Sequence, residues 1–261
     1  MNLGLENKAV LVTGGSSGIG LETARRFAAE GARVLICARR SEVLDAARDD
    51  IEDSTGQAVE TAQADVTSVP SIDRLLDTVS ERFGRLDVLV NNAGTGIYKP
   101  FLEVTDEELE YGMAINFFAQ FRITQRFTPM MIEQGGGSVV NVSGATGATV
   151  QDDPFLSSAT GPAKAAEIRL SRILAAELGP HNIRVNVVVP GLVLTSERFA
   201  KWEREMSQRD LLAWGSSQIP LAGDEWGTPE ELANLIVFAA SGSVRFMTGA
   251  VLIADGGQNK S

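Results

Sequence analysis

The strongest constraint on the fold is a glycine-rich turn between a short apolar run and a helical pattern. Residues 9–12 are continuously apolar, as in a buried parallel strand, and residues 21–29 have helical periodicity. Between them lies Thr13-Gly14-Gly15-Ser16-Ser17-Gly18-Ile19-Gly20. Glycines also occur in plain turns, but here they allow a pyrophosphate to approach the amides that begin the next helix. The strand before the turn and the helix after it therefore predict a dinucleotide site.

The alternation of buried strands and helices continues to the end of the chain. We predict strands at 33–38, 58–64, 86–90, 138–142, 183–189 and 251–254, and helices at 41–53, 70–83, 106–133, 162–178 and 229–240. Parallel strands joined by right-handed crossovers need helices on both faces of their sheet. The pattern therefore predicts an α/β fold, a doubly wound parallel sheet of the Rossmann type, with residues 1–261 as a single domain.

The composition excludes several classes of protein. The chain has 44% hydrophobic and 22% charged residues, as ordinary globular proteins do. A net charge of −11 without a large basic cluster repels a phosphate backbone, so nucleic acid is not an expected partner. We find neither a long apolar run nor a basic leader, and we expect a cytoplasmic protein with no membrane segment. The single cysteine, Cys37, lies in an apolar run and is predicted to be a buried core residue.

Several motifs spread over nearly the whole chain resemble those of the short-chain dehydrogenase/reductase family. They are the Gly-x-x-x-Gly-x-Gly turn, Asn91-Asn92-Ala93-Gly94, Asn116, Lys164, Pro190-Gly191 and Asp255-Gly256-Gly257. The resemblance implies that Gly14, Gly18 and Gly20 line a pyrophosphate. It also implies that Asp65 meets the adenine, that Asn92 supports the central strands and that Thr195 touches the nicotinamide carboxamide. We expect a cofactor site formed by Gly14, Ser16, Ser17, Gly18, Ile19, Gly20, Arg39, Arg40, Asp65, Val66, Asn92, Gly94, Lys164, Pro190, Gly191 and Thr195.

The residues after the second predicted strand bear on which cofactor is bound. An acidic residue there accepts hydrogen bonds from the ribose hydroxyls of NAD, whereas this chain has Arg39-Arg40. The guanidinium fork pairs well with a 2′-phosphate. We therefore expect NADP(H) as the cofactor; the alternative is that the two arginines are solvated residues that precede a helix.

The catalytic residues are where the resemblance breaks down. Family members that reduce carbonyls use Asn, Ser, Tyr and Lys, with the Tyr four residues before the Lys; here Thr160 precedes Lys164. Threonine is a far weaker acid than a phenol and its hydroxyl reaches less far. The serine is also in doubt, because Asn141-Val142-Ser143-Gly144 has glycine where the family usually has its second serine, and either Ser143 or Thr146 can substitute.

The candidate catalytic set is therefore Asn116, Ser143, Thr160 and Lys164. By the resemblance Asn116 holds a water and Lys164 binds the nicotinamide ribose; the alternatives are a residue at a helix bend and a surface lysine. Tyr98 is expected to face the substrate pocket, whereas Tyr111 is expected to pack on its helix. His181, which follows Gly179-Pro180, is expected to cap a helix at the surface.

Two functions are compatible with these residues. The first is an NADP(H)-dependent oxidoreductase that acts on a carbonyl or alcohol with an atypical proton donor. The alternative is a non-redox cyclase, dehydratase or isomerase, or a catalytically silent NADP-binding protein; Thr160 itself is either natural or introduced. Residues 192–227 have the weakest periodicity and hold all three tryptophans, Trp202, Trp214 and Trp226, so we expect a lid over a small-molecule substrate, large and apolar or aromatic. By the resemblance the chain forms a homotetramer through helices at 106–133 and 162–179.

Overall fold

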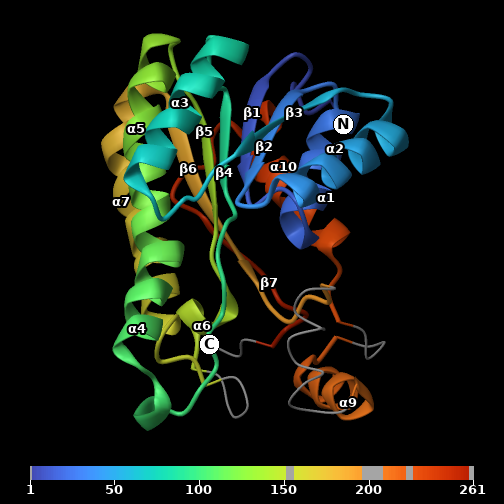
Figure 1. The fold of residues 1–261 in the computed structure, drawn as a ribbon, viewed down its shortest axis with the longest axis vertical. Helices are drawn as coiled ribbons and strands as arrows, with labels where there is room; N and C mark the ends of the chain where they lie inside the picture. The colour runs from blue at the N-terminus through green and yellow to red at the C-terminus, as the bar shows by residue number, and fades with distance from the viewer. Residues whose placement is uncertain (1, 151–155, 196–207, 222–225, 259–261) are drawn as a thin grey trace.

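The fold is a parallel β-sheet with helices on both faces, as the sequence predicts (Figure 1). The computed structural model describes residues 2–150, 156–195, 208–221 and 226–258. Its seven strands are all parallel, in the order β3-β2-β1-β4-β5-β6-β7. They are β1 (Ala9–Thr13), β2 (Arg33–Ala38), β3 (Val59–Gln63), β4 (Val88–Asn91), β5 (Gly137–Val142), β6 (Ile183–Pro190) and β7 (Val251–Ala254).

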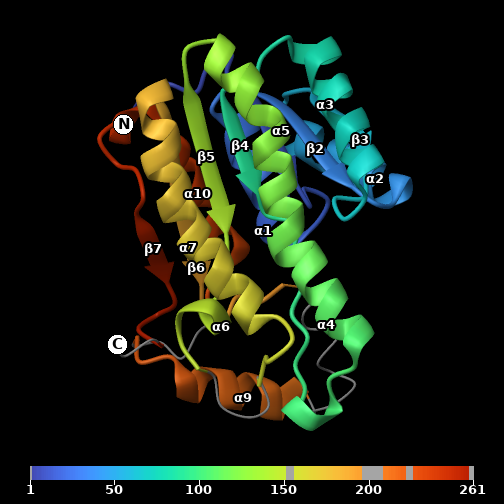
Figure 2. The same cartoon turned by 90° about the vertical axis from the view of Figure 1, so that its left-hand side faces the viewer.

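Two groups of helices cover the sheet. Figure 2 shows one group in front of the strands, namely α3 (Val69–Phe83), α5 (Ala119–Glu133) and α7 (Gly161–Leu178). The other group lies behind the strands and consists of α1 (Gly18–Ala29), α2 (Ser41–Thr55) and α10 (Pro229–Ala240). The shorter elements are α4 (Asp106–Met113), α6 (Ala145–Ala148), α9 (Gln208–Gln218), the 3₁₀ turns η1 (Phe101–Glu103), η3 (Gly179–His181) and η4 (Gly242–Val244), and the π-helix η2 (Ala114–Phe118).

The core explains why the strand sequences are continuously apolar. Val10 and Val12 of β1 face the cluster that includes the buried residues of α1, α2 and α10. Leu11, between them, faces the cluster that includes those of α3 and α5. Since both faces are covered, every side chain of the strand must be buried. Cys37 of β2 is fully buried as predicted, and burial raises the pKa of its thiol to about 12.

One long helix in the prediction is divided in the structure. The sequence predicts a continuous helix over 106–133, whereas α4 and α5 are separated by the π-helix η2. Asn116 lies in η2, where its Nδ2 donates to the Gly112 carbonyl and its Oδ1 accepts from the Thr95 amide. A side chain that bonds the backbone in this way competes with regular helix geometry, and such π segments are frequent at functional sites.

The strand order places a crevice at one end of the sheet. The chain builds β1, β2 and β3 outward in one direction and then crosses to β4 on the other side of β1. Ligands of open α/β sheets bind at such a switch point, outside the carboxyl ends of the strands. In Figures 1 and 2 this end of the sheet faces α4, α6 and α9. No helix in the described part of the chain is long and apolar enough to cross a bilayer.

Candidate functional site

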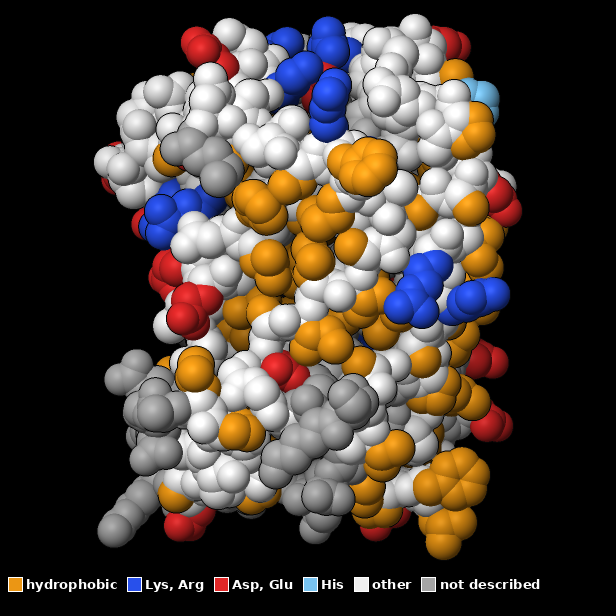
Figure 3. Space-filling model, turned by 180° about the vertical axis from the view of Figure 1, so that it is seen from behind, with side chains coloured by type: hydrophobic (Ala, Val, Ile, Leu, Met, Phe, Trp, Pro, Cys, Tyr) orange, Lys and Arg blue, Asp and Glu red, His pale blue; other side chains and the backbone are white. Residues whose placement is uncertain are grey.

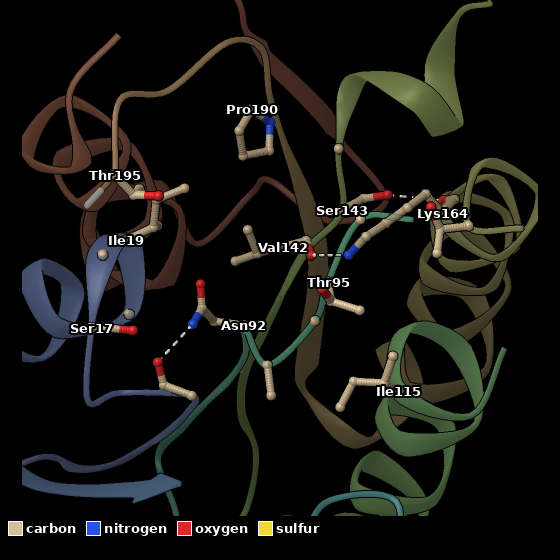
Figure 4. A pocket seen from close by; sticks show the side chains of 18 of the residues that line it. Ser17, Ile19, Asn92, Thr95, Ile115, Val142, Ser143, Lys164, Pro190 and Thr195 are labelled. Carbon is tan, nitrogen blue, oxygen red and sulfur yellow. Dashed lines mark hydrogen bonds between the residues drawn. The ribbon is translucent and has the colours of Figure 1, made fainter. Parts of the chain in front are cut away.

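A cleft of about 400 Å³ lies at the carboxyl ends of the central strands. Figure 4 shows Ser17, Ile19 and Thr195 on one side of it and Thr95, Ile115 and Lys164 on the other. Most of the predicted site residues line this one cleft: Gly14, Ser16, Ser17, Gly18, Ile19, Gly20, Arg39, Arg40, Val66, Asn92, Gly94, Ser143, Thr160, Lys164, Pro190, Gly191 and Thr195. The structure therefore brings together residues that are up to 181 positions apart in the sequence, from Gly14 to Thr195.

The glycine turn has the tight geometry that the sequence predicts. Gly14 and Gly18 have φ angles of 64° and 52°, in the left-handed region that favours glycine. A Cβ at Gly20 would overlap the Gly14 carbonyl and the Asn92 side chain. Ser17, the N-cap of α1, makes no side-chain capping bond, so the amides of the first turn of α1 face the cleft without a side-chain cap.

Asn92 ties the turn to the centre of the sheet. Its Nδ2 donates to the carbonyl oxygens of Thr13, at 3.0 Å, and Gly14, at 3.1 Å. Its own amide donates to the Thr13 hydroxyl at 3.0 Å. These bonds fix the end of β1 against the loop after β4, which agrees with the supporting position expected for Asn92.

Arg39 and Arg40 are exposed and line one end of the cleft. Nη1 of Arg39 donates to the Tyr111 hydroxyl at 3.3 Å. The prediction that Tyr111 only packs on its helix is wrong, because the residue lines the cleft and is 38% exposed. Tyr98 also lines the cleft, as expected, with its ring over the backbone of Gly96.

Two predicted residues lie beside the cleft rather than in its wall. Asp65 is half-buried, and its Oδ1 accepts from the amide and the hydroxyl of Thr67 at 2.9 and 2.7 Å. Asn116 is fully buried below Gly94 and has both ends of its amide hydrogen-bonded. Neither residue is among those that line the cleft.

Lys164 is mostly buried and reaches the wall of the cleft from α7. Its Nζ donates to the Val142 carbonyl at 3.3 Å, as Figure 4 shows, and lies 3.3 Å from Oε2 of Glu167. The interpretation of Lys164 as a surface lysine is therefore wrong. The hydroxyl of Ser143 donates to the Lys164 main-chain carbonyl at 2.8 Å.

Thr160 is buried at the N-cap of α7, one turn before Lys164. Its hydroxyl lies 2.6 Å from the Ser157 hydroxyl and accepts from the Ile97 amide at 3.3 Å. Among the described residues, a Cβ at Gly144 would lie 4.0 Å from Lys164 Cδ and 4.0 Å from Thr146 Oγ1. The position of the usual serine therefore has room for a Cβ at ordinary contact distance, with Thr146 beside it.

The other side of the cleft is formed by the segment after β6. The Gly191 amide donates to the Ala254 carbonyl, and a Cβ at Gly191 would overlap Asp255, so the Pro190-Gly191 and Asp255 motifs meet. Thr195 lies over Gly18 at the start of α1. Of the predicted lid, Trp226 is buried against Gly215 and Trp214 is half-buried, while Trp202 lies outside the described residues.

Sequence reasoning missed Glu167 and Ser157. Glu167 is fully buried, and burial raises the pKa of its carboxyl to about 7, while Lys164 and the Ser143 side chain oppose the rise. The available signal was a glutamate three residues after Lys164, which is typical of an exposed ion pair on a helix. His181, by contrast, is exposed on η3 and is not among the residues that line the cleft, which agrees with the expected surface position.

Comparisons with known sequences agree with this geometry. A family model described as "Enoyl-(Acyl carrier protein) reductase" matches residues 14–259. The chain is 36% identical over 255 residues to a 3-oxoacyl-(acyl-carrier-protein) reductase of Thermotoga maritima, with 97% of this chain and 98% of that one covered. It is 31% identical to a 7alpha-hydroxysteroid dehydrogenase of Bacteroides fragilis, with 97% and 94% covered.

Solved structures give the same result. The L-sorbose reductase of Gluconobacter frateurii, solved in complex with NADPH and L-sorbose, matches with a TM-score of 0.92 at 30% identity and covers 100% of both chains. A variant of actinorhodin polyketide ketoreductase with NADPH matches with a TM-score of 0.90 at 30% identity and covers 98% of both. The family match and these relatives, which span almost the whole of each chain, show that the chain belongs to the short-chain dehydrogenase/reductase family of oxidoreductases.

Proposed function

We propose that the protein is an NADP(H)-dependent oxidoreductase that interconverts a carbonyl and an alcohol without the usual tyrosine acid. One observation carries the proposal: the glycine turn, Arg39, Arg40 and Lys164 line a single cleft at the switch point of the sheet. A dinucleotide needs amide donors for its pyrophosphate, cations for an added phosphate and donors near its second ribose. The cleft has all three.

The residues present fit such a cofactor. The pyrophosphate would lie against the turn at Gly14, Gly18 and Gly20. A Cβ at Gly20 would overlap the Gly14 carbonyl, so only glycine allows the turn to pack this closely on the start of α1. Thr195 faces Gly18 and would lie beside the nicotinamide end. We also assign Ser16, Ser17, Ile19, Val66, Gly94, Pro190 and Gly191 to this site because they line the same cleft. NADPH supplies a hydride to the carbonyl carbon when it is bound.

The chain's own residues position the reactants and supply charge. The Lys164 ammonium can donate to a ribose hydroxyl or to the developing oxyanion of the substrate. Thr160 is a poor acid and already accepts from the Ile97 amide, so we do not assign it the proton donation. Tyr98, in the loop after β4, brings a phenol to the wall of the cleft. The candidate sources of the proton are therefore Tyr98, water and the substrate itself. Asn116 holds the loop at Thr95.

Substitution of Arg39 tests the choice of NADP(H). We expect Arg39→Ala to raise the Kd for NADPH at least about tenfold and to leave the Kd for NADH almost unchanged, because only the 2′-phosphate loses a charge-assisted partner. Fluorescence titration of both nucleotides measures the effect. Arg172→Ala removes an exposed arginine on α7 and serves as the control for net charge. Equal affinities of the unmodified protein for NADPH and NADH would contradict the assignment.

The surroundings of the cleft favour a large apolar substrate. A second hollow of about 540 Å³ adjoins the cleft at Thr146. Its lining includes Phe101, Val150, Leu156 and Pro162. Apolar walls of this kind bind hydrophobic ligands, with a few polar groups to orient them.

Single-turnover kinetics test the proposed reaction. NADPH-loaded protein is mixed with sugar ketones, decalones, cyclic and aromatic ketones and acyl thioesters, and the absorbance of NADPH is followed. We expect at least one apolar ketone to consume NADPH in proportion to the protein, because preorganised binding supplies much of the rate enhancement even without an optimal acid. Demonstrated NADPH binding without consumption by any carbonyl would favour a non-redox use of the pocket.

We further propose that the protein is a homotetramer. Phe118 and Phe121, at the junction of η2 and α5, and Ile173 on α7 are each about 40% exposed, and in Figure 3 hydrophobic side chains also gather over the edge strand β7. Contiguous exposed apolar side chains are typical of subunit interfaces. Light scattering is expected to give the mass of four 27.8-kDa chains. A monomer at micromolar concentration would contradict this assembly.

A further inference from the structure

Glu167 is a buried carboxylate that the proposed reaction does not yet use. It lies on α7 one turn beyond Lys164 and is completely shielded from solvent. Its Oε1 accepts from Lys164 Nζ at 3.4 Å, and its Oε2 is 3.3 Å from the same ammonium but accepts no hydrogen bond within the described part of the chain. Ser143, which follows β5, is near enough to lower the pKa of the carboxyl, while its hydroxyl donates to the Lys164 main-chain carbonyl.

Lys164 is the charged partner of this carboxylate. Burial raises the pKa of Glu167, and Lys164 is the charged group that opposes the rise. The described elements packed against α7 add no other charge at this point: α6, η2 and β5 have no ionisable side chains. Arg184 of β6 bonds the carbonyl oxygens of residues 239–241 at the opposite end of the sheet, and His181 of η3 lies beyond the far end of α7.

Stability gives no reason for a glutamate here. The attraction within a buried ion pair is largely offset by the loss of hydration, and an apolar side chain at the same place is often equally stable or more so. Glu167 does not line the cleft, whereas Lys164 does. Whatever the carboxylate does to a ligand must therefore act through a neighbour that lines the cleft, and Lys164 is the charged neighbour.

We propose that Glu167 is a positioning residue for the reaction: its carboxylate fixes the Lys164 side chain beside the Val142 carbonyl and keeps it in the ammonium form at the wall of the cleft. The inference rests on the proposed function, because a charged lysine there serves to bind a ribose hydroxyl or an oxyanion. The proposal gives a role to the fully buried Glu167. Thr160 cannot ionise near neutral pH, so Glu167 rather than residue 160 is the acidic partner of Lys164 on this helix.

The charge of Lys164 can be measured without any assumption about the reaction. Trace acetylation with acetic anhydride at pH 8, read by mass spectrometry, reports the fraction of each lysine that is a free amine. We expect Lys164 to be acetylated about tenfold faster in Glu167→Gln, because the opposite charge that favours the ammonium is gone. Glu177→Gln removes an exposed glutamate from the same helix and should leave the rate unchanged. Equal rates in Glu167→Gln and the unmodified protein would overturn the proposal.

The pH dependence of NADPH binding links this charge to the site. Between pH 7 and 10, the loss of NADPH affinity is expected to begin about one pH unit lower in Glu167→Gln than in the unmodified protein, and Glu167→Asp should restore most of the difference. If Glu167 served only for packing, its substitution would not change the pH at which NADPH affinity is lost. If the unmodified protein binds no NADPH, the proposed function fails, while the acetylation result still decides the role of Glu167.

A measurement on the unmodified protein covers the case in which Glu167→Gln does not fold. Carbon-13 NMR of the glutamate side-chain carboxyls, followed against pH, is expected to show one carboxyl that titrates near pH 7. Acetylation of Lys164 removes its positive charge and should raise the pH at which this carboxyl titrates; no change on acetylation would mean that Glu167 and Lys164 are not paired and would overturn the proposal.

Discussion

Thr160→Tyr is expected to raise kcat for carbonyl reduction at least about a hundredfold, since a positioned general acid contributes about 10²–10⁴ to a rate. Thr160 lines the cleft at the N-cap of α7, one turn before Lys164, so a phenol at this position would extend into the cleft beside the ammonium. A neighbouring cation lowers the pKa of a phenol and makes it a better proton donor. Steady-state assays with a ketone that consumes NADPH measure the change.

The matched control is Thr160→Phe. It places the same ring at the N-cap and breaks the same hydrogen bonds to Ser157 and Ile97, but it lacks the hydroxyl. A gain in Thr160→Tyr that is absent from Thr160→Phe would show that the remaining residues form a competent reductase site. Equal activity of the two variants would mean that the pocket does not place a carbonyl oxygen near residue 160, and would favour the non-redox alternative.

The second large effect concerns stability and pH. Folding raises the pKa of the Glu167 carboxyl from its ordinary value of 4.5 to about 7, so the folded state holds this proton more tightly than the unfolded state. The stability that results is fully present below pH 4.5 and is lost as the pH rises through 7. The shift corresponds to about 3 kcal/mol of unfolding free energy.

We expect this loss to be absent from Glu167→Gln, which resembles the protonated carboxyl. Urea unfolding of both proteins at pH 4.5, 6, 7 and 8 should show the variant gaining up to about 3 kcal/mol relative to the unmodified protein over that range. The difference in unfolding free energy between the two proteins cancels the contributions of the other titrating groups. As a control, Glu177→Gln removes an exposed carboxylate, and its difference from the unmodified protein should not change with pH. A constant difference across this pH range would contradict the raised pKa of Glu167.

The fold was largely predictable because its signals are local. Each buried strand is a short apolar run bounded by glycine or polar residues, and each run reappears as a strand with boundaries shifted by a few residues, such as β4 at Val88–Asn91. The glycine turn was identified from its spacing between strand and helix, since tight turns leave few residue choices, and Asn92 was identified through the family resemblance. Right-handed crossovers restrict the order of the strands without fixing it, and the order β3-β2-β1-β4-β5-β6-β7 comes from the structure.

The predictions that failed concern side chains that contact residues far away in the sequence. The π-helix depends on the bonds of Asn116 to both Gly112 and Thr95, and no helical periodicity reports the second of these. Tyr111 lies in the cleft because α4 brings it to Arg39, 72 residues earlier in the chain. Tertiary contacts of this kind override local patterns.

Glu167 could not be assigned from sequence because burial decides its chemistry. A glutamate three residues after a lysine on a helix is typical of a solvated ion pair, whereas here the carboxylate has no exposed surface. Its burial becomes evident only once η2 is packed against α7 and β5 is hydrogen-bonded to it. The surroundings of Gly144 are also known only from the structure, in which a Cβ there would lie 4.0 Å from Lys164 Cδ and from Thr146 Oγ1.

Isothermal titration calorimetry with NADPH, NADP⁺, NADH and NAD⁺ tests most directly that this cleft is an NADP(H) site. We expect one molecule of NADPH per chain to bind with a micromolar or lower Kd, and the Kd for NADH to be at least about tenfold higher because it lacks the phosphate that pairs with Arg39 and Arg40. A protein that is folded yet binds none of the four nucleotides would contradict the assignment of the cleft, and with it the proposed reaction.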